Sequence, residues 1–270
     1  DCFGFTKEEV LNALKEYGLE DRQNEVKKWY DGFCFGDIKD IYNPWSIINY
    51  LDNKVAAPYW VNTSSNDLIG KVLQEGNVQI KESFERLLRQ ETIYTEIDEQ
   101  MIHDQSDIDE NAIWSLMLAS GYLKVNSSYV KETSRGWNRI YELSITNFEV
   151  LIMLKKMVRS WFSPSASNYN EFMKALLQDD IKAMNVYMNR VATSVFSFFD
   201  TGKMPSEATE PERFYHGFVL GLIVDLEERY SITSNRESGF GRYDVMLEPK
   251  NKKDPAILME FKIQDPDDEK

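Results

Sequence analysis

The sequence has few cysteines, a deficit of positive charge and no long apolar run. Its 270 residues include two cysteines, Cys2 and Cys34, too few for a disulfide framework or a thiolate metal site. Lysine and arginine number 31 against 45 aspartates and glutamates, so the net charge is −14. This balance argues against a broad basic surface that binds nucleic acid regardless of sequence. No apolar run approaches the roughly 18–20 residues that cross a bilayer, and no secretory leader is evident, so we expect a cytoplasmic protein.

What the chain does contain is typical of a globular protein with two or more modest domains. Hydrophobic residues make up 42% of the sequence and aromatic residues 13%, enough for each domain to have its own core. The chain begins at Asp1 without a methionine and ends on an acidic tail, so we expect it to be a piece of something longer.

Local signals predict several helices. Thr6 and Glu9 have the spacing of a capping box, and the helix that they open is expected to end at Gly18. A second helix is expected over residues 23–30. The stretch 180–200 is expected to be a well-buried helix, because many of its positions are apolar.

The residues most informative about function lie in two predicted strands near the C-terminal end. Apolar Val245 and Leu247 alternate with Asp244 and Met246, which is the period of a strand with two different faces. The turn-forming and charged residues 249–254 predict that a second strand runs back beside the first.

The second strand is expected over residues 257–263, with Glu260 and Lys262 on the face opposite its apolar side chains. Side chains two residues apart point the same way, so Asp244 on the first strand can approach both. Two carboxylates with an ammonium beside them form a candidate hard-metal site. The alternative is a solvated strand face with a cross-strand ion pair, which contributes little to stability.

These residues carry a resemblance to a known family. Asp244 followed by Glu260-Phe261-Lys262 resembles the active-site signature of the PD-(D/E)XK nuclease superfamily. The run from Glu237 to Asp244 looks like the branch found at the C-terminus of certain bacterial AAA-ATPase-like proteins. The resemblance implies that Asp244 and Glu260 hold a divalent cation, magnesium or manganese. It also implies that Lys262 positions or activates the attacking water and stabilises charge on the phosphate. The partner implied is nucleic acid, DNA in preference to RNA.

The same resemblance points to an acidic residue on the helix before the first strand of the nuclease core. Glu212 is the candidate, on a helix expected to start at Thr209 and to run to about Tyr230. The alternative role of Glu212 is to close the capping box of that helix. His216, which shares a face with Glu212, is expected to be a hydrogen-bonded core residue.

Two further sequence features are a pair of glycines on the predicted C-terminal helix and a second histidine in the acidic stretch. Gly217 and Gly221 lie four residues apart on the same helix and form a flat stripe against which a sheet could pack. The other histidine, His103, lies in the acidic stretch 96–110, which is expected to be a linker or loop with no partner for it.

Three aromatic segments near the N-terminus are expected to form firmly packed structural corners. They cover residues 29–36, 41–47 and 59–66, where tyrosine and tryptophan combine large buried area with a polar group. They also resemble the lid-side half of the AAA-ATPase-like family, which carries a phosphate-binding loop upstream. No Gly-x-x-x-x-Gly-Lys-Ser/Thr run occurs in this chain, so no nucleotide-binding role is carried over.

The middle of the chain has the outline of a winged helix. An apolar helix near residues 113–118 precedes strands expected at 122–125 and 140–143. The tip of the wing between these strands holds Arg135, Trp137 and Arg139, which could touch a phosphate backbone. The alternative for this wing is packing against a neighbouring domain.

The sequence therefore predicts an α+β protein in three parts. Residues 1–95 form an ATPase-like lid-side helical region, 96–163 a winged-helix-like domain, and 164–270 a helical linker with a partial PD-(D/E)XK nuclease-like α/β core. The core is expected to be incomplete, with a protein partner or self-association covering its sheet. The function indicated is metal-dependent phosphodiester hydrolysis by the nuclease domain of a larger ATPase-linked protein. The alternative is a non-catalytic regulatory or protein-interaction module.

Overall fold

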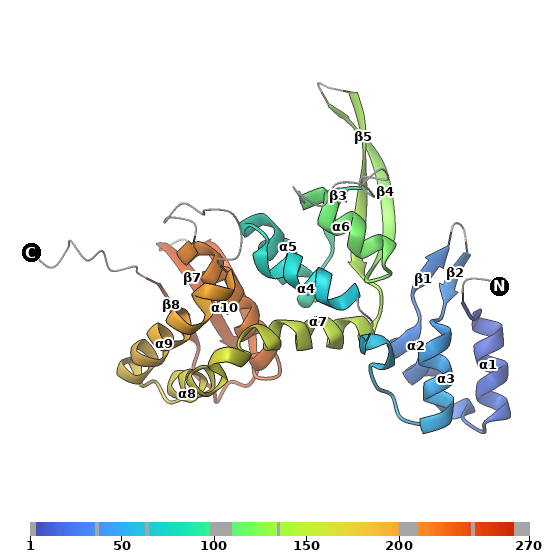
Figure 1. Ribbon diagram of the computed structural model, residues 1–270, viewed down its shortest axis with the longest axis horizontal. Coiled ribbons are helices and arrows are strands. Elements are labelled where there is room, and N and C mark those ends of the chain that lie inside the picture. The colour runs from blue at the N-terminus through green and yellow to red at the C-terminus, as the bar shows by residue number, and fades with distance from the viewer. Residues whose placement is uncertain are drawn as a thin grey trace, which may run out of the picture. The chain divides into compact units, whose positions relative to one another are not determined.

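The computed structural model describes residues 4–35, 38–62, 65–97, 110–133, 136–199, 210–238 and 241–261. Within them the chain forms ten α-helices and three small antiparallel sheets, which confirms the predicted α+β class (Figure 1). Two compact units divide the chain: Asp1–Leu73 with Arg86–Met157, and Gln74–Glu85 with Val158–Lys270. The three-part division made from the sequence stays a prediction. Among the described residues no helix combines the length and apolarity needed to cross a membrane.

Three helices build the N-terminal part of the first unit: α1 (Lys7–Glu16), α2 (Gln23–Tyr30) and α3 (Pro44–Asn53). The predicted capping box is present. The backbone N–H of Glu9 donates to Thr6 Oγ1 at 3.3 Å, and Glu9 Oε2 accepts the Thr6 N–H at 2.7 Å. The buried side chains shared by the three helices include Val10, Leu14, Val26, Tyr30, Ile47, Tyr50 and Leu51. Burial of these apolar side chains stabilises the packing of the three helices, by a free energy of about 25 cal/mol per Å² of apolar surface removed from water.

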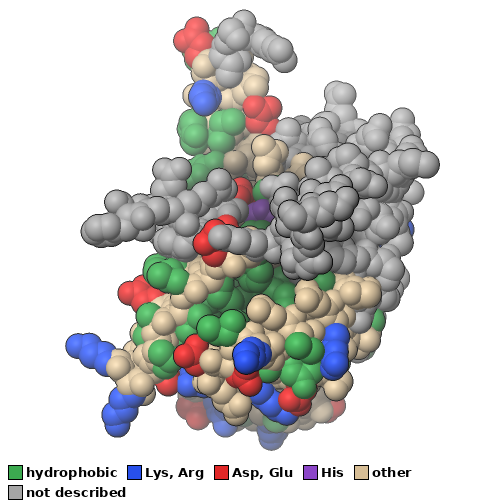
Figure 2. All heavy atoms as spheres, turned by 90° about the vertical axis from the view of Figure 1, so that its left-hand side faces the viewer, with side chains coloured by type: hydrophobic (Ala, Val, Ile, Leu, Met, Phe, Trp, Pro, Cys, Tyr) green, Lys and Arg blue, Asp and Glu red, His purple; other side chains and the backbone are tan. Residues whose placement is uncertain are grey.

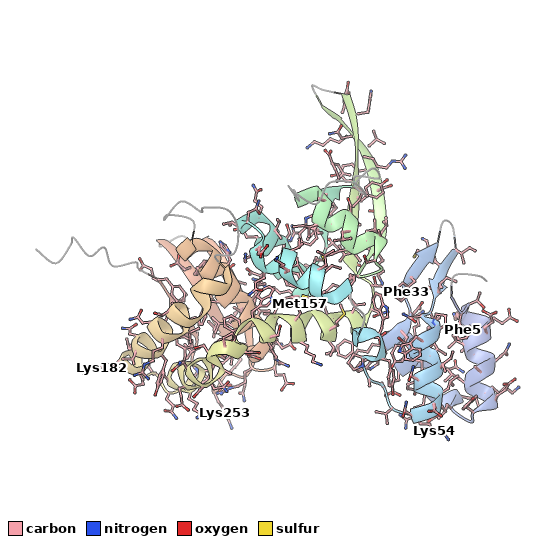
Figure 3. The ribbon with its side chains drawn as sticks, in the orientation of Figure 1. Phe5, Phe33, Lys54, Met157, Lys182 and Lys253 are labelled. Atoms are coloured by element: carbon pink, nitrogen blue, oxygen red, sulfur yellow. The ribbon has the colours of Figure 1, made fainter. Side chains whose placement is uncertain are left out.

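Several aromatic side chains of the three N-terminal segments are packed as predicted, but Trp45 is 61% exposed. Phe33 lies on β1 (Phe33–Phe35), which pairs with β2 (Ile38–Ile41). Its ring, labelled in Figure 3, meets Trp60 edge-on with 6.0 Å between ring centroids. Trp60 sits on the short 3-10 helix Tyr59–Asn62 and also packs against the buried Tyr122 at 5.2 Å.

A buried carboxylate ties together three segments of the first unit. Glu149, near the start of α7 (Phe148–Trp161), accepts the Ser46 hydroxyl at 2.8 Å and the Trp60 N–H at 2.7 Å. Burial raises the pKa of Glu149, and these hydrogen bonds oppose that rise. The sequence does not signal this role, because a glutamate in the first turn of a helix normally faces water and favours the helix dipole.

The second sheet of the first unit is a long hairpin with one added strand. Its order is β3 (Ile93–Glu96), β5 (Gly136–Ile145) and β4 (Leu123–Thr133), and α6 (Glu110–Ala119) precedes the hairpin. The strands expected at 122–125 and 140–143 are only the inner ends of β4 and β5. Figure 1 shows the hairpin projecting beyond α6, and Trp137 near its tip is 70% exposed. Arg135 lies outside the described residues.

The second unit contains three whole helices and the C-terminal sheet, together with most of α5 (Val78–Leu88) and the last turn of α7. The helices are α8 (Ala166–Leu177), α9 (Ile181–Phe199) and α10 (Glu210–Leu226). The sheet has the order β6 (Tyr230–Ser238), β7 (Gly241–Pro249) and β8 (Ile257–Met259), and both pairings are antiparallel. The remaining helices, α4 (Ser65–Glu75) and α5 (Val78–Leu88), lie between the aromatic segments and β3 in the sequence.

Three expectations for the second unit are wrong. Helix α9 is not well buried over its described side chains, since Ile181 is 64% and Val186 48% exposed, and Figure 2 shows hydrophobic side chains at the surface on this side of the molecule. An apolar composition alone does not say whether another element covers a helix. Helix α10 ends at Leu226 rather than near Tyr230. A Cβ on Gly221 would meet the Phe162 ring at 2.7 Å and the Tyr169 hydroxyl at 2.8 Å, so the nearest neighbours of this glycine are aromatic side chains rather than a sheet.

Candidate active site on the C-terminal sheet

The register of the C-terminal sheet ends one residue before the two predicted carboxylates. Val245 pairs with Met259 and Met246 pairs with Leu258, and β8 ends there; one further step of this register would set Asp244 across from Glu260. Directly opposite residues put their side chains on the same face of a sheet. The prediction that β7 and β8 form a hairpin is confirmed.

The two faces of this sheet have different surroundings. Val245 and Leu247 are fully buried and Met259 nearly so, and together they form the apolar face of the sheet. On the other face Leu258 is 66% exposed, and Glu260 is exposed as well. Asp244 is partly buried. Solvent therefore reaches Glu260, and Asp244 only in part.

Helix α10 and the chain after β8 hold Asp244 in place. Asp244 Oδ2 accepts the Phe261 N–H at 2.7 Å, and the Tyr215 hydroxyl donates to the backbone carbonyl of Asp244 at 2.5 Å. The Phe261 ring meets the Tyr215 ring at 5.3 Å and the Phe218 ring at 6.0 Å between centroids. Because Phe261 donates to a side chain, the regular ladder ends at Met259 and β8 is shorter at this end than the strand expected from the sequence.

The other predicted site residues are only partly described. Glu212 lies in the first turn of α10, but its side chain is outside the described residues, as are Lys262 and Thr209. Glu237 and Arg242 pair in the β6–β7 register, and their side chains are also outside the described residues. The role of each of these residues therefore stays a prediction.

His216 is buried in the core, as expected, but one of its two ring nitrogens lacks the expected hydrogen bond. It is 2% exposed, and its Nδ1 has no hydrogen-bond partner among the described residues. The pKa of His216 is lowered to about 4, mainly by burial and secondly by the positive charge of Lys81. A neutral imidazole at this position is therefore part of the folded state near neutral pH.

Sequence reasoning missed a buried polar group beside the same sheet. Glu85 of α5 is buried and accepts the Ser234 hydroxyl of β6 at 2.7 Å. Lys81, one turn earlier and also buried, donates to the backbone carbonyls of Gln74, at 2.9 Å, and Gly76. No local signal marks these residues, because a lysine and a glutamate four positions apart normally form a solvated pair on a helix surface.

The carboxylates of this site have the chemistry of divalent-metal ligands. Within the described part of the chain no three potential metal-ligating side chains come together. Asp244 and Glu260 nevertheless supply carboxylate oxygens, the ligand type that magnesium and manganese prefer. Asp244 Oδ2 is already bonded to Phe261, and Oδ1 accepts no hydrogen bond from the described residues. The residue types fit a hard divalent cation with two protein carboxylates.

Comparison with known proteins identifies this part of the chain. Residues 210–270 match the family model of the PD-(D/E)XK nuclease superfamily. The matched segment starts with α10, spans the whole C-terminal sheet, and contains Glu212, Asp244, Glu260 and Lys262. The resemblance of the C-terminal segment to this superfamily is thus confirmed, and members of it generally use divalent metals. No curated protein and no solved structure matches the chain. Residues 1–209 lie outside the matched segment, so the ATPase-like resemblance stays a prediction.

Proposed function

We propose that the C-terminal domain hydrolyses phosphodiester bonds with a divalent cation, magnesium or manganese, held by Asp244 and Glu260. The observation that carries this proposal is the β7–β8 register, whose last pair is Val245 with Met259; one further step of this register would set Asp244 opposite Glu260, inside the segment that matches the nuclease superfamily. Directly opposite residues in an antiparallel pair have Cβ atoms about 4.5–5.5 Å apart, so two carboxylates there can share one ion.

The surroundings of Asp244 support a role as the better-fixed ligand. The Phe261 N–H orients one carboxylate oxygen, and the Tyr215 hydroxyl anchors the backbone at the same residue. Hydrogen bonds that orient a ligating carboxylate commonly affect metal affinity by about 10–100-fold. Glu260 lies beyond the regular ladder and is exposed, so it would complete the ligand set from the open side of the sheet.

Lys262 and Glu212 have roles that follow from their positions in the sequence. Lys262 is two residues after Glu260 and would share its face on an extended chain, where its ammonium can stabilise negative charge on the scissile phosphate and orient a water molecule. Glu212, from the first turn of α10, would add a third carboxylate or act as a base. A bound divalent cation would polarise the phosphate oxygens and stabilise the charge that develops on them.

The β4–β5 hairpin is the proposed contact with nucleic acid, DNA in preference to RNA. Its outer part exposes Tyr129 and Trp137 together with the cations Lys131 and Arg139. A two-stranded ribbon fits the major groove of DNA, and basic side chains contact the phosphates. The same exposed aromatic surface also supports the alternative, packing against a neighbouring protein.

Several wider assignments are proposed from the sequence; three rest on the resemblance, and the cytoplasmic location rests on the few cysteines and the lack of a long apolar run. They are the winged-helix nature of the middle segment, the ATPase-like origin of the N-terminal region, the three-part domain division and the cytoplasmic location. A larger ATPase-linked parent protein would agree with all four.

The second candidate function is a non-catalytic interaction module. Leu258, on the same face as Glu260, is one of the most exposed large apolar side chains of the described chain, and exposed apolar surface beside a short strand favours association. In that case a partner or a second copy would cover this face of the sheet.

Nuclease assays on the Glu260→Gln variant distinguish the two functions. We expect metal-dependent cleavage of DNA by the parent protein and a loss of about 100-fold or more in the variant, because several kcal/mol of charge stabilisation would be removed. Glu248→Gln is the matched control, since Glu248 is an exposed glutamate on the same sheet. Equal loss in both variants, or no metal-dependent cleavage by the unaltered protein, contradicts the nuclease proposal.

A further inference from the structure

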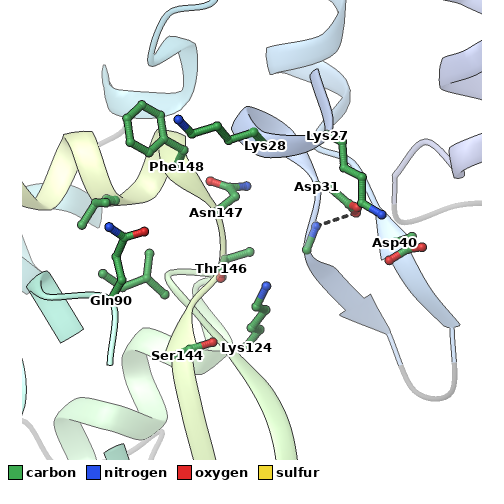
Figure 4. Close-up of a pocket in the computed structure, with 13 residues that line it drawn as sticks. Lys27, Lys28, Asp31, Asp40, Gln90, Lys124, Ser144, Thr146, Asn147 and Phe148 are labelled. Carbon is green, nitrogen blue, oxygen red and sulfur yellow. Dashed lines mark hydrogen bonds between the residues drawn. The ribbon is translucent and has the colours of Figure 1, made fainter. Parts of the chain in front are cut away.

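The first unit contains a pocket far in sequence from the nuclease segment. Its volume is about 520 Å³, and it is formed by α2, the two strands of the β4–β5 hairpin near their inner ends, and the start of α7 (Figure 4). Pockets of roughly 300–1,000 Å³ are typical of small-molecule sites in proteins. The volume is therefore sufficient for a small ligand of about mononucleotide size.

Three lysines from two elements surround this pocket. Lys27 and Lys28 come from α2 and Lys124 from β4, and Figure 4 shows all three along its border. No ion pair found among the described residues includes any of them. The Lys28 ammonium instead lies 4.3 Å from the centre of the Phe148 ring. In a chain with a net charge of −14, such a local group of cations favours an anionic ligand.

Two aspartates in the pocket partly balance the lysines. Asp31 is buried and accepts the Gly32 N–H at 2.7 Å, so part of its hydrogen-bonding capacity is already used. The pKa of Asp31 is raised, mainly by burial and secondly by the negative charge of the nearby Asp40. Asp40 is exposed at the edge of the pocket. With both carboxylates ionised the lysines still exceed them by one charge.

A buried amide in the pocket lacks an acceptor. Asn147 Oδ1 accepts the Val150 N–H at 3.1 Å and so caps α7, while Asn147 Nδ2 is buried without a hydrogen-bond partner among the described residues. A buried donor of this kind is unfavourable unless an acceptor is provided. A turn of this amide toward the pocket would let an anionic oxygen supply one, next to the positive end of the helix dipole.

Gly32 shapes the wall on which Lys124 rests. Its φ is +115°, and a Cβ there would approach the Thr146 carbonyl oxygen to 2.3 Å and Lys124 Nζ to 3.3 Å. A side chain at this position would therefore collide with backbone and crowd the Lys124 ammonium. The lack of a side chain at Gly32 therefore leaves room for the Lys124 ammonium at the pocket.

We propose that this pocket binds a small phosphorylated compound, with phosphate oxygens held by Lys124, Lys28 and the Asn147 amide. Lysine is a common phosphate ligand, and the start of a helix of 14 residues adds favourable backbone dipoles. The proposal does not depend on nuclease activity. A phosphorylated metabolite and inorganic phosphate both carry the phosphate group that the pocket would recognise. Their relative affinities for the protein show which of the two is the ligand.

The test is calorimetric titration of the full chain with inorganic phosphate, pyrophosphate and a nucleoside 5′-monophosphate at low salt. We expect saturable binding with a Kd below about 1 mM for at least one of them. Equal affinity for phosphate and for the monophosphate would assign the site to the inorganic anion, and tighter binding of the monophosphate would assign it to a phosphorylated metabolite.

Two variants and one control make the result specific. Asn147→Asp keeps a good helix cap but replaces the free amide with a negative charge, and Lys124→Ala removes a cation; we expect each to weaken binding about tenfold or more. Lys15→Ala, an exposed lysine in the last turn of α1 that does not line the pocket, should leave affinity unchanged. Absence of saturable binding by the unaltered protein, unchanged affinity in both variants, or loss in the control equal to that in Lys124→Ala would overturn the proposal.

Discussion

Replacement of Asp244 can separate its hydrogen bond from its charge. The Asp244 carboxylate accepts the Phe261 N–H at 2.7 Å and so connects β7 to the segment after β8. In Asp244→Asn the side-chain oxygen can still accept this hydrogen bond, but the charge proposed to bind the metal is lost. In Asp244→Ala both are lost.

The structure sets the size of the expected effects. A hydrogen bond to a charged group contributes about 1.5–3 kcal/mol, and one between neutral groups about 0.5–1.5 kcal/mol. Because Asp244 is only partly buried, we expect Asp244→Ala to lower the free energy of unfolding by roughly 1.5 kcal/mol, near the low end of that range. Asp244→Asn should lower it by less than about 1 kcal/mol. For either variant we expect metal-dependent cleavage to fall by about 100-fold or more.

Thermal unfolding followed by calorimetry, together with the cleavage assay, measures both effects. The Ala variant should unfold about 5 °C earlier than the unaltered protein, and the Asn variant should lie between them. An Asn variant that is as unstable as the Ala variant would show that the hydrogen bond to Phe261 is not what Asp244 contributes to stability. An Asn variant with full metal-dependent cleavage would refute the assignment of Asp244 as a ligand.

Three further predictions follow from the packing and charge of particular residues. The pKa of His216 is lowered to about 4 in the folded protein, so the neutral ring contributes about 3 kcal/mol to the free energy of unfolding above pH 6.5, and this contribution is lost as the pH falls toward 4. A His216→Phe variant should therefore show a flatter dependence of Tm on pH between 6.5 and 4. An unchanged slope would contradict this prediction. Gly221→Ala should lower the free energy of unfolding in chemical denaturation by about 1–3 kcal/mol, because its Cβ would overlap the Phe162 ring. Gly70→Ala, whose Cβ would meet Met157 at 3.4 Å, should be neutral or slightly stabilising. Equal effects of the two substitutions would contradict the packing argument. If the hairpin binds DNA, Arg139→Ala should weaken affinity and reduce the slope of log K against log salt by about 1, and salt-insensitive behaviour of the unaltered protein would make the hairpin a packing element.

The sequence by itself determined the elements whose signals are local. The spacing of Thr6 and Glu9 is sufficient to place the start of α1, because a capping box is formed entirely within one turn of helix. The alternation around Val245 predicted a strand with a buried and an exposed face, and the turn after Pro249 predicted its pairing with β8. The placement of Asp244 and Glu260 on one sheet face stays a prediction from residue order, because the paired part of β8 ends at Met259.

Tertiary structure alone decided which polar groups are buried and which apolar groups are not. Glu149 is buried and accepts a hydrogen bond from Ser46, 103 positions away in the sequence; Glu85 is buried and accepts one from Ser234, 149 positions away. Ile181 remains exposed because no described element covers that part of α9, although its sequence is as apolar as that of a core helix. The lysine-lined pocket is likewise built from residues of α2, β4 and α7. Burial and proximity of this kind depend on contacts between distant segments, and no periodicity within one segment encodes them.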